Sequence, residues 1–143
     1  MRKRRSRGFT LIELMVVVMI IAILAALIVP RVVQRQSDAM RAKAASDISE
    51  LDAALQQYHL DNDGYPTNEE GLAALRTAPQ SAKNWRGPYL QKPIPPDPWG
   101  SDYVYQNPGP SGQDFIVESY GKDGQPGGDG DNADVTEGDD SGQ

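Results

Sequence analysis

The chain has 143 residues, which is enough for one small domain and one membrane helix. Five of its 14 basic side chains lie in residues 1–8, so residues 9–143 carry nine basic against 20 acidic side chains, a net charge of −11. That excess argues against nonspecific nucleic-acid binding, which needs Lys and Arg to neutralise phosphates. The absence of cysteine rules out a disulfide, so a metal ion becomes a candidate staple for a small domain.

The chain begins with a basic leader, residues 1–8, that is too short and too basic for an ordinary secretory signal. An apolar run from Leu11 to Val29 follows, interrupted only by Glu13. As a helix this run covers about 28 Å, enough for a bilayer core of about 30 Å. The preceding positive charges predict a cytoplasmic N-terminus with the rest of the chain outside. A carboxylate inside such a helix costs about 2.5–3.5 kcal/mol on insertion scales, so Glu13 indicates function.

The helical pattern resumes directly after Pro30 with an amphipathic character. We therefore predict one helix from about Thr10 to His59, with a membrane part at 9–30, an amphipathic continuation at 31–60 and a globular head at 61–143. The apolar positions of the continuation are Val33, Met40, Ala44, Ile48, Leu51, Leu55 and Tyr58.

The head begins with a predicted short helix at Thr67–Arg76, which Thr67 or Asn68 would cap. Residues 84–100 are predicted to form a long loop, because five prolines there disrupt both helices and ladders. Two short strands are predicted at Tyr103–Gln106 and Phe115–Ser119. The fold class is therefore α+β: one long helix and a small head.

No catalytic constellation is visible, so the chain is predicted not to be an enzyme. His59 is the single histidine, and without a second histidine or a cysteine it cannot form a His-based zinc site or a Cys–His pair. The serines lack a Ser-His-Asp or Gly-x-Ser-x-Gly context. The aromatic side chains around the proline loop indicate either the core of the head or a ligand platform: Trp85, Tyr89, Trp99, Tyr103 and Tyr105.

The segment from Asp123 to Val135 is rich in Gly and Asp. Carboxylates and backbone carbonyls on flexible loops are the ligands that Ca²⁺ prefers. The run partly matches an EF-hand loop but has Asp134 where the glycine belongs. A disordered, solvating acidic tail is the alternative interpretation.

Several motifs together resemble the major pseudopilins of type II secretion systems, within the type IV pilin-like superfamily. The first of these motifs marks the superfamily, and the later ones favour the major pseudopilins over type IV pilins, whose heads usually carry a disulfide. The matching segments are Gly8–Glu13, Leu60–Thr67, Gly87–Leu90, Pro95–Gly100 and Ser119–Gly124.

This resemblance implies that a prepilin peptidase cleaves after Gly8 and that the new N-terminal Phe9 is methylated. It implies that Glu13 guides assembly by pairing with the amine of a neighbouring Phe9. The implied fold is a long helix packed on a small antiparallel sheet. The implied product is a helical homopolymer, the periplasmic pseudopilus, working with minor pseudopilins and an inner-membrane assembly platform. The precursor would be a single-pass bacterial inner-membrane protein with a periplasmic head.

The resemblance also implies Ca²⁺ as a cofactor in the C-terminal loop, which favours the calcium interpretation over the disordered tail. Its side-chain ligands would be drawn from Asp123, Asp131, Asn132 and Asp134. Backbone carbonyls near Tyr120, Lys122 and Gln125 would complete the shell.

Three other functions stay open at this point. One is a type IV pilus subunit, and another is a membrane-tethered calcium- or exoprotein-binding module that never polymerises. The third, a DNA-uptake pilin, is disfavoured by the acidic charge of residues 9–143.

Overall fold

The computed structural model describes residues 8–137, and for residues 27–34 it describes the backbone alone. The predicted leader therefore lies, except for Gly8, outside the described residues. The chain divides into two compact units, residues 1–37 and residues 38–143, and the second is called the head here. The α-helix α1, Leu11–Asn62, contributes to both units.

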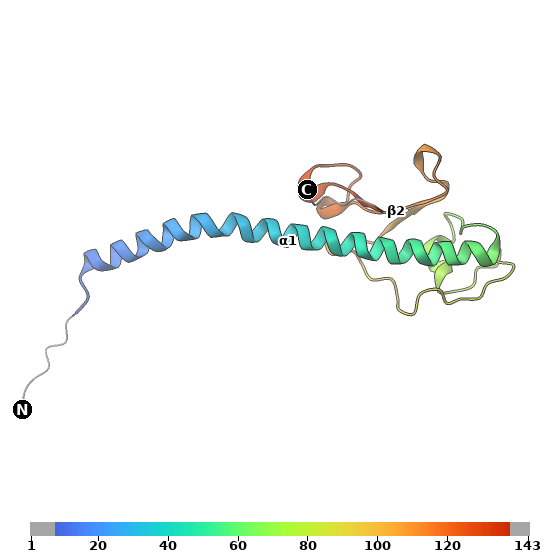
Figure 1. Cartoon of the computed structure of the whole chain (residues 1–143), viewed down its shortest axis with the longest axis horizontal. Helices are drawn as coiled ribbons and strands as arrows, with labels where there is room; N and C mark the ends of the chain where they lie inside the picture. The colour runs from blue at the N-terminus through green and yellow to red at the C-terminus, as the bar shows by residue number, and fades with distance from the viewer. Residues whose placement is uncertain (1–7, 138–143) are drawn as a thin grey trace, which may run out of the picture. The chain divides into compact units, whose positions relative to one another are not determined.

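Within the head, α1 is the element around which the rest of the chain packs (Figure 1). Its buried side chains recur every three or four residues and so form one stripe along the helix. Asp63 follows the helix at φ 57°, and its N–H donates to the carbonyl of His59 over 2.9 Å. A left-handed residue of this kind is a common helix stop. The stripe is formed by Ala44, Ile48, Leu51, Leu55 and Tyr58.

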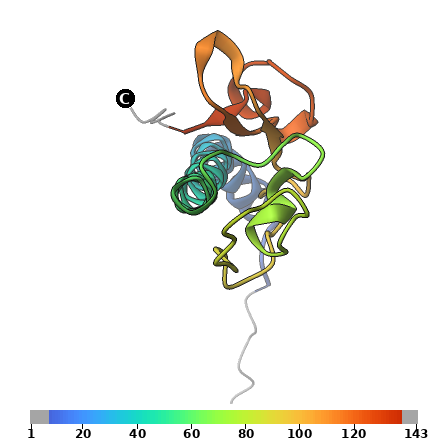
Figure 2. The ribbon, with the colours of Figure 1, turned by 90° about the vertical axis from the view of Figure 1, so that its right-hand side faces the viewer.

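Two layers cover that stripe from different sides, as the view along the helix shows (Figure 2). The segment 65–100 covers one flank and contains the 3₁₀ helix η1, Gly71–Leu75. The other flank is covered by an antiparallel sheet of three strands in the order β1-β2-β3. The strands are β1, Val104–Gln106, β2, Ile116–Ser119, and β3, Val135–Thr136.

The register of the sheet sets partly or fully buried residues of neighbouring strands opposite one another. Tyr105 of β1 lies opposite Val117 of β2, and Ser119 of β2 lies opposite Val135 of β3. Val117 and Val135 are nearly inaccessible, so the sheet closes the core over α1. The short 3₁₀ helices η2, Pro110–Gly112, η3, Gly121–Asp123, and η4, Gly130–Asn132, lie in the connections.

The predicted fold class is confirmed. The two predicted strands are present as β1 and β2, each beginning one residue later than predicted, and three other details differ. The helix runs three residues further than His59. The prediction of a helix at Thr67–Arg76 is wrong in length and type, because only the five-residue 3₁₀ helix η1 forms there. Thr67 and Glu70 form a turn closed by mutual side-chain hydrogen bonds, and Gly71 adopts φ 55°, so the helix cannot begin earlier. The strand β3 was not predicted, since two residues within a Gly/Asp-rich stretch carry no periodicity.

The five aromatic side chains predicted around the proline loop belong to the core. Tyr103 is buried, and the other four pack partly buried against the core cluster, which confirms the first of the two interpretations. The indole N–H of Trp85 donates to the carbonyl of Ala74 over 2.9 Å, and the hydroxyl of Tyr103 donates to Asp47 over 2.9 Å. These bonds satisfy the polar ends of buried rings and connect the loop to η1 and α1.

Candidate functional site

The first candidate site is the segment that leads into α1. Gly8 and Phe9 precede the helix and are exposed, and a methyl group built on Gly8 would meet nothing within 4 Å. The Phe9 side chain is 88% exposed. In this chain the Gly8–Phe9 bond is therefore sterically open to an enzyme.

Glu13 lies in the first turn of α1 and forms a capping box with Thr10. The backbone N–H and the hydroxyl of Thr10 each lie 3.3 Å from Oε2 of Glu13, and the N–H of Glu13 lies 3.2 Å from the Thr10 hydroxyl. The box satisfies donors that a helix start otherwise leaves unpaired, and an acidic side chain is favourable there. Sequence reasoning missed Thr10, although the Thr-x-x-Glu spacing is the signature of such a box.

The side chains from Gly8 to Ala26 are all exposed, including large apolar ones from Leu11 to Leu24. Among the described residues, no helix is both long enough and apolar enough to cross a membrane.

The second candidate site is the C-terminal loop, residues 120–135, which is folded by contacts within itself. The carboxylate of Asp123 accepts the N–H of Gln125 over 3.1 Å, and Oδ2 of Asp134 accepts the N–H of Gly127 over 2.8 Å. The ammonium of Lys122 lies 4.0 Å from the carboxylate of Asp131, which links η3 to η4. Residues 120–135 therefore form a folded loop rather than a disordered tail.

Two glycines let the two arms of this loop approach closely. Gly121 has φ 62° and Gly128 has φ 95°. A Cβ on Gly121 would lie 2.8 Å from the carbonyl oxygen of Ala133, and one on Gly128 would lie 2.7 Å from that of Asn132. Only glycine combines this backbone conformation with this proximity.

The loop fits a hard cation through one specific feature. Oδ1 of Asp134 is buried and accepts no hydrogen bond from the described residues, although such an atom normally has a partner. Burial, followed by the charge of Asp134, raises the pKa of Glu118, so these two carboxylates interact unfavourably with each other. Within residues 8–137, no three His, Cys, Asp or Glu side chains form a metal-binding group. A bound ion would accordingly rely on backbone carbonyls as well as carboxylates.

The predicted ligands are not all equivalent in this loop. Asp123 and Asp134 each use one oxygen for a backbone N–H, whereas Asp131 faces Lys122. Asn132 contributes its main chain to the close contacts with Gly121 and Gly128. The carbonyls near Tyr120, Lys122 and Gln125 belong to η3 and the turn that follows it.

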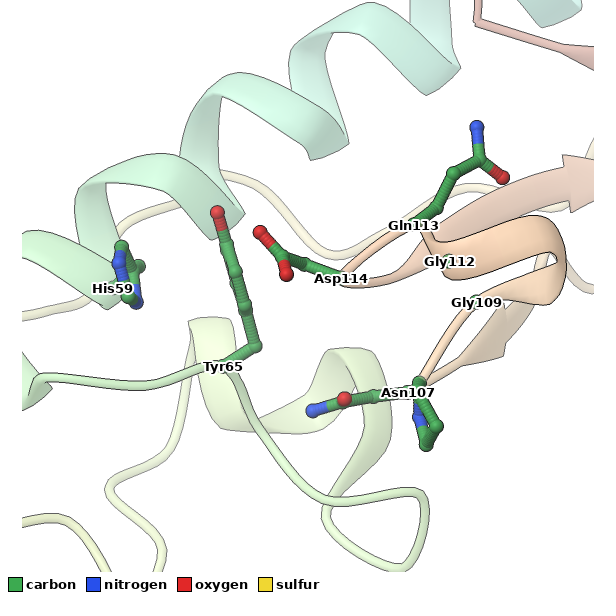
Figure 3. Close-up of a pocket in the computed structure, with 8 residues that line it drawn as sticks. His59, Tyr65, Asn107, Gly109, Gly112, Gln113 and Asp114 are labelled. Atoms are coloured by element: carbon green, nitrogen blue, oxygen red, sulfur yellow. The ribbon is translucent and has the colours of Figure 1, made fainter.

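A separate open groove of about 580 Å³ lies between the end of α1 and the β1–β2 connection (Figure 3). The His59 ring stacks on Tyr65 with centroids 4.4 Å apart. Burial, followed by the charge of Asp114, raises the pKa of Tyr65. Asp114 is the one carboxylate among the residues that line the groove. The groove offers no nucleophile–base pair on which to base a catalytic hypothesis.

Residues 31–138 match the family model described as type II secretion system (T2SS), protein G, and residues 3–29 match the prokaryotic N-terminal methylation motif. The chain is 45% identical over 137 residues to type II secretion system core protein G of Vibrio cholerae, which covers 94% of this chain and 92% of that protein. It is also 45% identical to the Pseudomonas aeruginosa protein of the same name over 138 residues, 94% of this chain and 96% of the relative.

A solved structure is similar as well: the crystal structure of the major pseudopilin from the type 2 secretion system of enterohaemorrhagic Escherichia coli. The TM-score is 0.60 at 38% sequence identity, over 71% of this chain and 89% of the other.

Proposed function

The chain belongs to the family of type II secretion system protein G, and from this membership we propose how its two ends serve a pseudopilus. It is a structural subunit of the type II secretion pseudopilus. The observation that carries this conclusion is the 45% identity to a core protein G along 94% of the chain. As a member with an N-terminal methylation motif, it is a membrane-anchored, periplasmic, pilus-like subunit that assembles with other secretion components.

We propose that a prepilin peptidase cleaves the precursor after Gly8 and that Phe9 is then methylated. The open Gly8–Phe9 bond and the match to the methylation motif support this. Cleavage removes five basic side chains and creates a positive amine on Phe9.

Glu13 is then the residue that sets assembly. In the precursor its carboxylate is held by Thr10. In a filament it pairs with the Phe9 amine of a neighbouring subunit, because an unpaired charge among apolar helices is strongly unfavourable. The exposed apolar side chains of residues 11–24 supply the surface that packs against lipid and against other subunits.

Ca²⁺ is the ligand of the C-terminal loop in this proposal. Asp123 and Asp134 provide carboxylate oxygens, Asp131 or Asn132 contributes from η4, and carbonyls near Tyr120, Lys122 and Gln125 complete the shell. The buried, unpaired Oδ1 of Asp134 is the feature that supports it. The ion supplies charge neutralisation for the loop and stabilises the folded head by mass action, about 2.7 kcal/mol at 100 times its dissociation constant.

We also propose the finer assignments, which family membership supports. The partners are further copies of this chain in a helical homopolymer, minor pseudopilins, the prepilin peptidase and the inner-membrane assembly platform. The chain inserts once through the bacterial inner membrane with the head in the periplasm. It has no enzymatic activity and binds no nucleic acid.

A non-polymerising tethered module is the competing function, and the residue that separates the two is Glu13. Intact mass of the membrane-extracted protein, with crosslinking, tests this in the wild type, Glu13→Gln and the control Glu69→Gln, whose side chain is exposed on the head. We expect a mass equal to Phe9–Gln143 plus one methyl group, and multimers that are lost only in Glu13→Gln. An uncut precursor, or multimers that persist without Glu13, would support the tethered module.

A further inference from the structure

Arg41 occupies an unexpected place on α1. It lies three residues before Ala44 and seven before Ile48, which puts it on the same helix face as the buried apolar stripe. A charged side chain on such a face needs partners, because burial of an unpaired charge is unfavourable. The partners come from the C-terminal loop, about ninety residues later in the sequence.

The guanidinium of Arg41 reaches three main-chain carbonyls of that loop. Nη1 donates to the oxygen of Ala133 over 2.9 Å and to that of Gly130 over 3.2 Å, and Nη2 donates to that of Asp134 over 3.4 Å. The three carbonyls span η4 and the residues that enter β3. One rigid, planar group therefore fixes the position of residues 130–134 against α1.

The charge of the loop makes this contact important. Residues 120–137 contain five acidic side chains and one basic side chain, Lys122. Without a counter-charge these carboxylates repel one another and favour an open loop. Arg41 brings a positive charge from the helix into contact with this segment. The acidic residues are Asp123, Asp129, Asp131, Asp134 and Glu137.

We propose that Arg41 is the positioning residue of the C-terminal loop: it holds the loop on α1 before any cation is present. Its bond to the carbonyl of Asp134 then orients the neighbouring carboxylate, whose Oδ1 is buried and unpaired. The consequence for Ca²⁺ rests on the proposed function, whereas the ordering of the ion-free loop does not. Outer partners of this kind typically change metal affinity by about 10–100-fold when removed.

Lys43 offers a matched control. It lies on the same helix, carries the same charge, and pairs with Asp47 four residues along α1 rather than with the loop. Lys43→Ala therefore changes the net charge of α1 by the same amount as Arg41→Ala but leaves the three carbonyl contacts intact.

The test is hydrogen–deuterium exchange of the full chain in detergent with a calcium chelator present, comparing peptides from residues 121–137 with peptides from residues 44–60. We expect Arg41→Ala to speed exchange of the loop severalfold while the helix peptides stay protected. Arg41→Lys should restore part of the protection, because an ammonium retains the charge but lacks the planar fork. Lys43→Ala should match the wild type.

A calcium titration of the same variants gives the second readout. We expect Arg41→Ala to weaken Ca²⁺ binding by about tenfold or more, with Arg41→Lys intermediate. If the wild type shows no response to Ca²⁺ while Arg41→Ala still frees the loop, the calcium proposal fails and the role of Arg41 stands. Unchanged loop exchange in both Arg41 variants, or equal effects of Arg41→Ala and Lys43→Ala, would overturn the role of Arg41. If Arg41→Ala does not fold, Arg41→Lys alone decides: loop protection equal to the wild type refutes the three-carbonyl contact.

Discussion

Asp97 connects the proline loop to the sheet from a buried position, and its removal gives a sharp test of the fold. The residue is 3% exposed. Its Oδ1 accepts the N–H groups of Trp99 over 3.1 Å and Ser101 over 2.8 Å, and its Oδ2 accepts the hydroxyl of Ser119 over 2.5 Å. Ser119 is fully buried in β2. One carboxylate thus satisfies three donors and joins residues 97–101 to the middle strand.

The expected loss of free energy of unfolding follows from the number of donors left without an acceptor. Asp97→Ala leaves three donors without their acceptor, and each buried unsatisfied group costs about 1 kcal/mol or more. The substitution should therefore lower the free energy of unfolding by about 3 kcal/mol, a large part of the roughly 5–15 kcal/mol typical of a domain. Asp97→Asn keeps Oδ1 for both N–H groups and presents an amide to the Ser119 hydroxyl, which can rotate to accept. Its loss should be about 1 kcal/mol.

Urea unfolding of the full chain in detergent measures both values, with tryptophan fluorescence reporting the loop through Trp99. Asp102→Ala is the control, because Asp102 is an exposed carboxylate in the same stretch of chain and should change stability by less than about 0.5 kcal/mol. The reasoning is refuted if the free energy of unfolding of Asp97→Ala lies within about 0.5 kcal/mol of the wild-type value. It is also refuted if Asp97→Asn is as damaging as Asp97→Ala, since charge rather than hydrogen bonding would then dominate.

Three further predictions test other parts of the head. Gly121→Ala should lower the free energy of unfolding of the head by more than about 2 kcal/mol, because the left-handed backbone costs roughly 1 kcal/mol and the new Cβ would also collide with the carbonyl of Ala133. Gly130→Ala is the control: Gly130 has φ 61° but open space around it, so only the backbone penalty applies. Thermal unfolding should show about half the loss of stability for Gly130→Ala. Burial, reinforced by the charge of Glu137, raises the pKa of Asp52 from 3.8 to about 6. The protonated carboxyl is therefore favoured in the folded state, so its stabilisation is complete below pH 3.8 and is lost as the pH rises through 6. Melting temperatures from pH 4 to pH 7 should thus fall more steeply in the wild type than in Asp52→Asn, and parallel curves would contradict this. Tyr103→Phe removes a buried hydroxyl donor to a carboxylate and should cost about 1.5–3 kcal/mol in urea unfolding; an unchanged midpoint would show that the bond contributes nothing.

The long-range pattern of the sequence was sufficient to predict the scaffold. The stripe from Ala44 to Tyr58 repeats at helical spacing over four turns, and long periodic segments are the strongest signal that a sequence gives. The helix was predicted to end at about His59, and the structure shows that a left-handed Asp63 follows its last residue, Asn62. The strands β1 and β2 were predicted because short runs of aromatic and β-branched residues there are separated by a loop rich in Gly and Pro.

What the sequence did not predict depends on contacts between residues that are far apart. The strand β3 exists because Val135 pairs with Ser119 and fills the core, and nothing within two residues signals that. Arg41 reads as one more charge on an amphipathic helix until the position of the loop is known. For the same reason, the sequence could not identify the ligand positions in the C-terminal loop: its Gly and Asp residues do not show which carboxylate keeps a free oxygen. The structure singles out Asp134.

The capping box at the start of α1 bears on how a carboxylate is tolerated in an otherwise apolar segment. Before cleavage, Glu13 has its own partners, the N–H and hydroxyl of Thr10, three residues earlier in the sequence. On the proposed function, cleavage then places a positive amine on Phe9 at the same helix end. In a filament, the Phe9 amine of a neighbouring subunit competes with Thr10 for the carboxylate, and a charge-assisted bond is roughly twice as strong as a neutral one. Glu13 would therefore be paired both before and after processing, and the change of partner would link cleavage to assembly. The Thr10→Val variant separates the two stages: we expect it to weaken the helix start in the uncut precursor while leaving crosslinked multimers of the processed chain intact. Loss of multimers with normal processing would show instead that the Thr10 hydroxyl is needed within the filament.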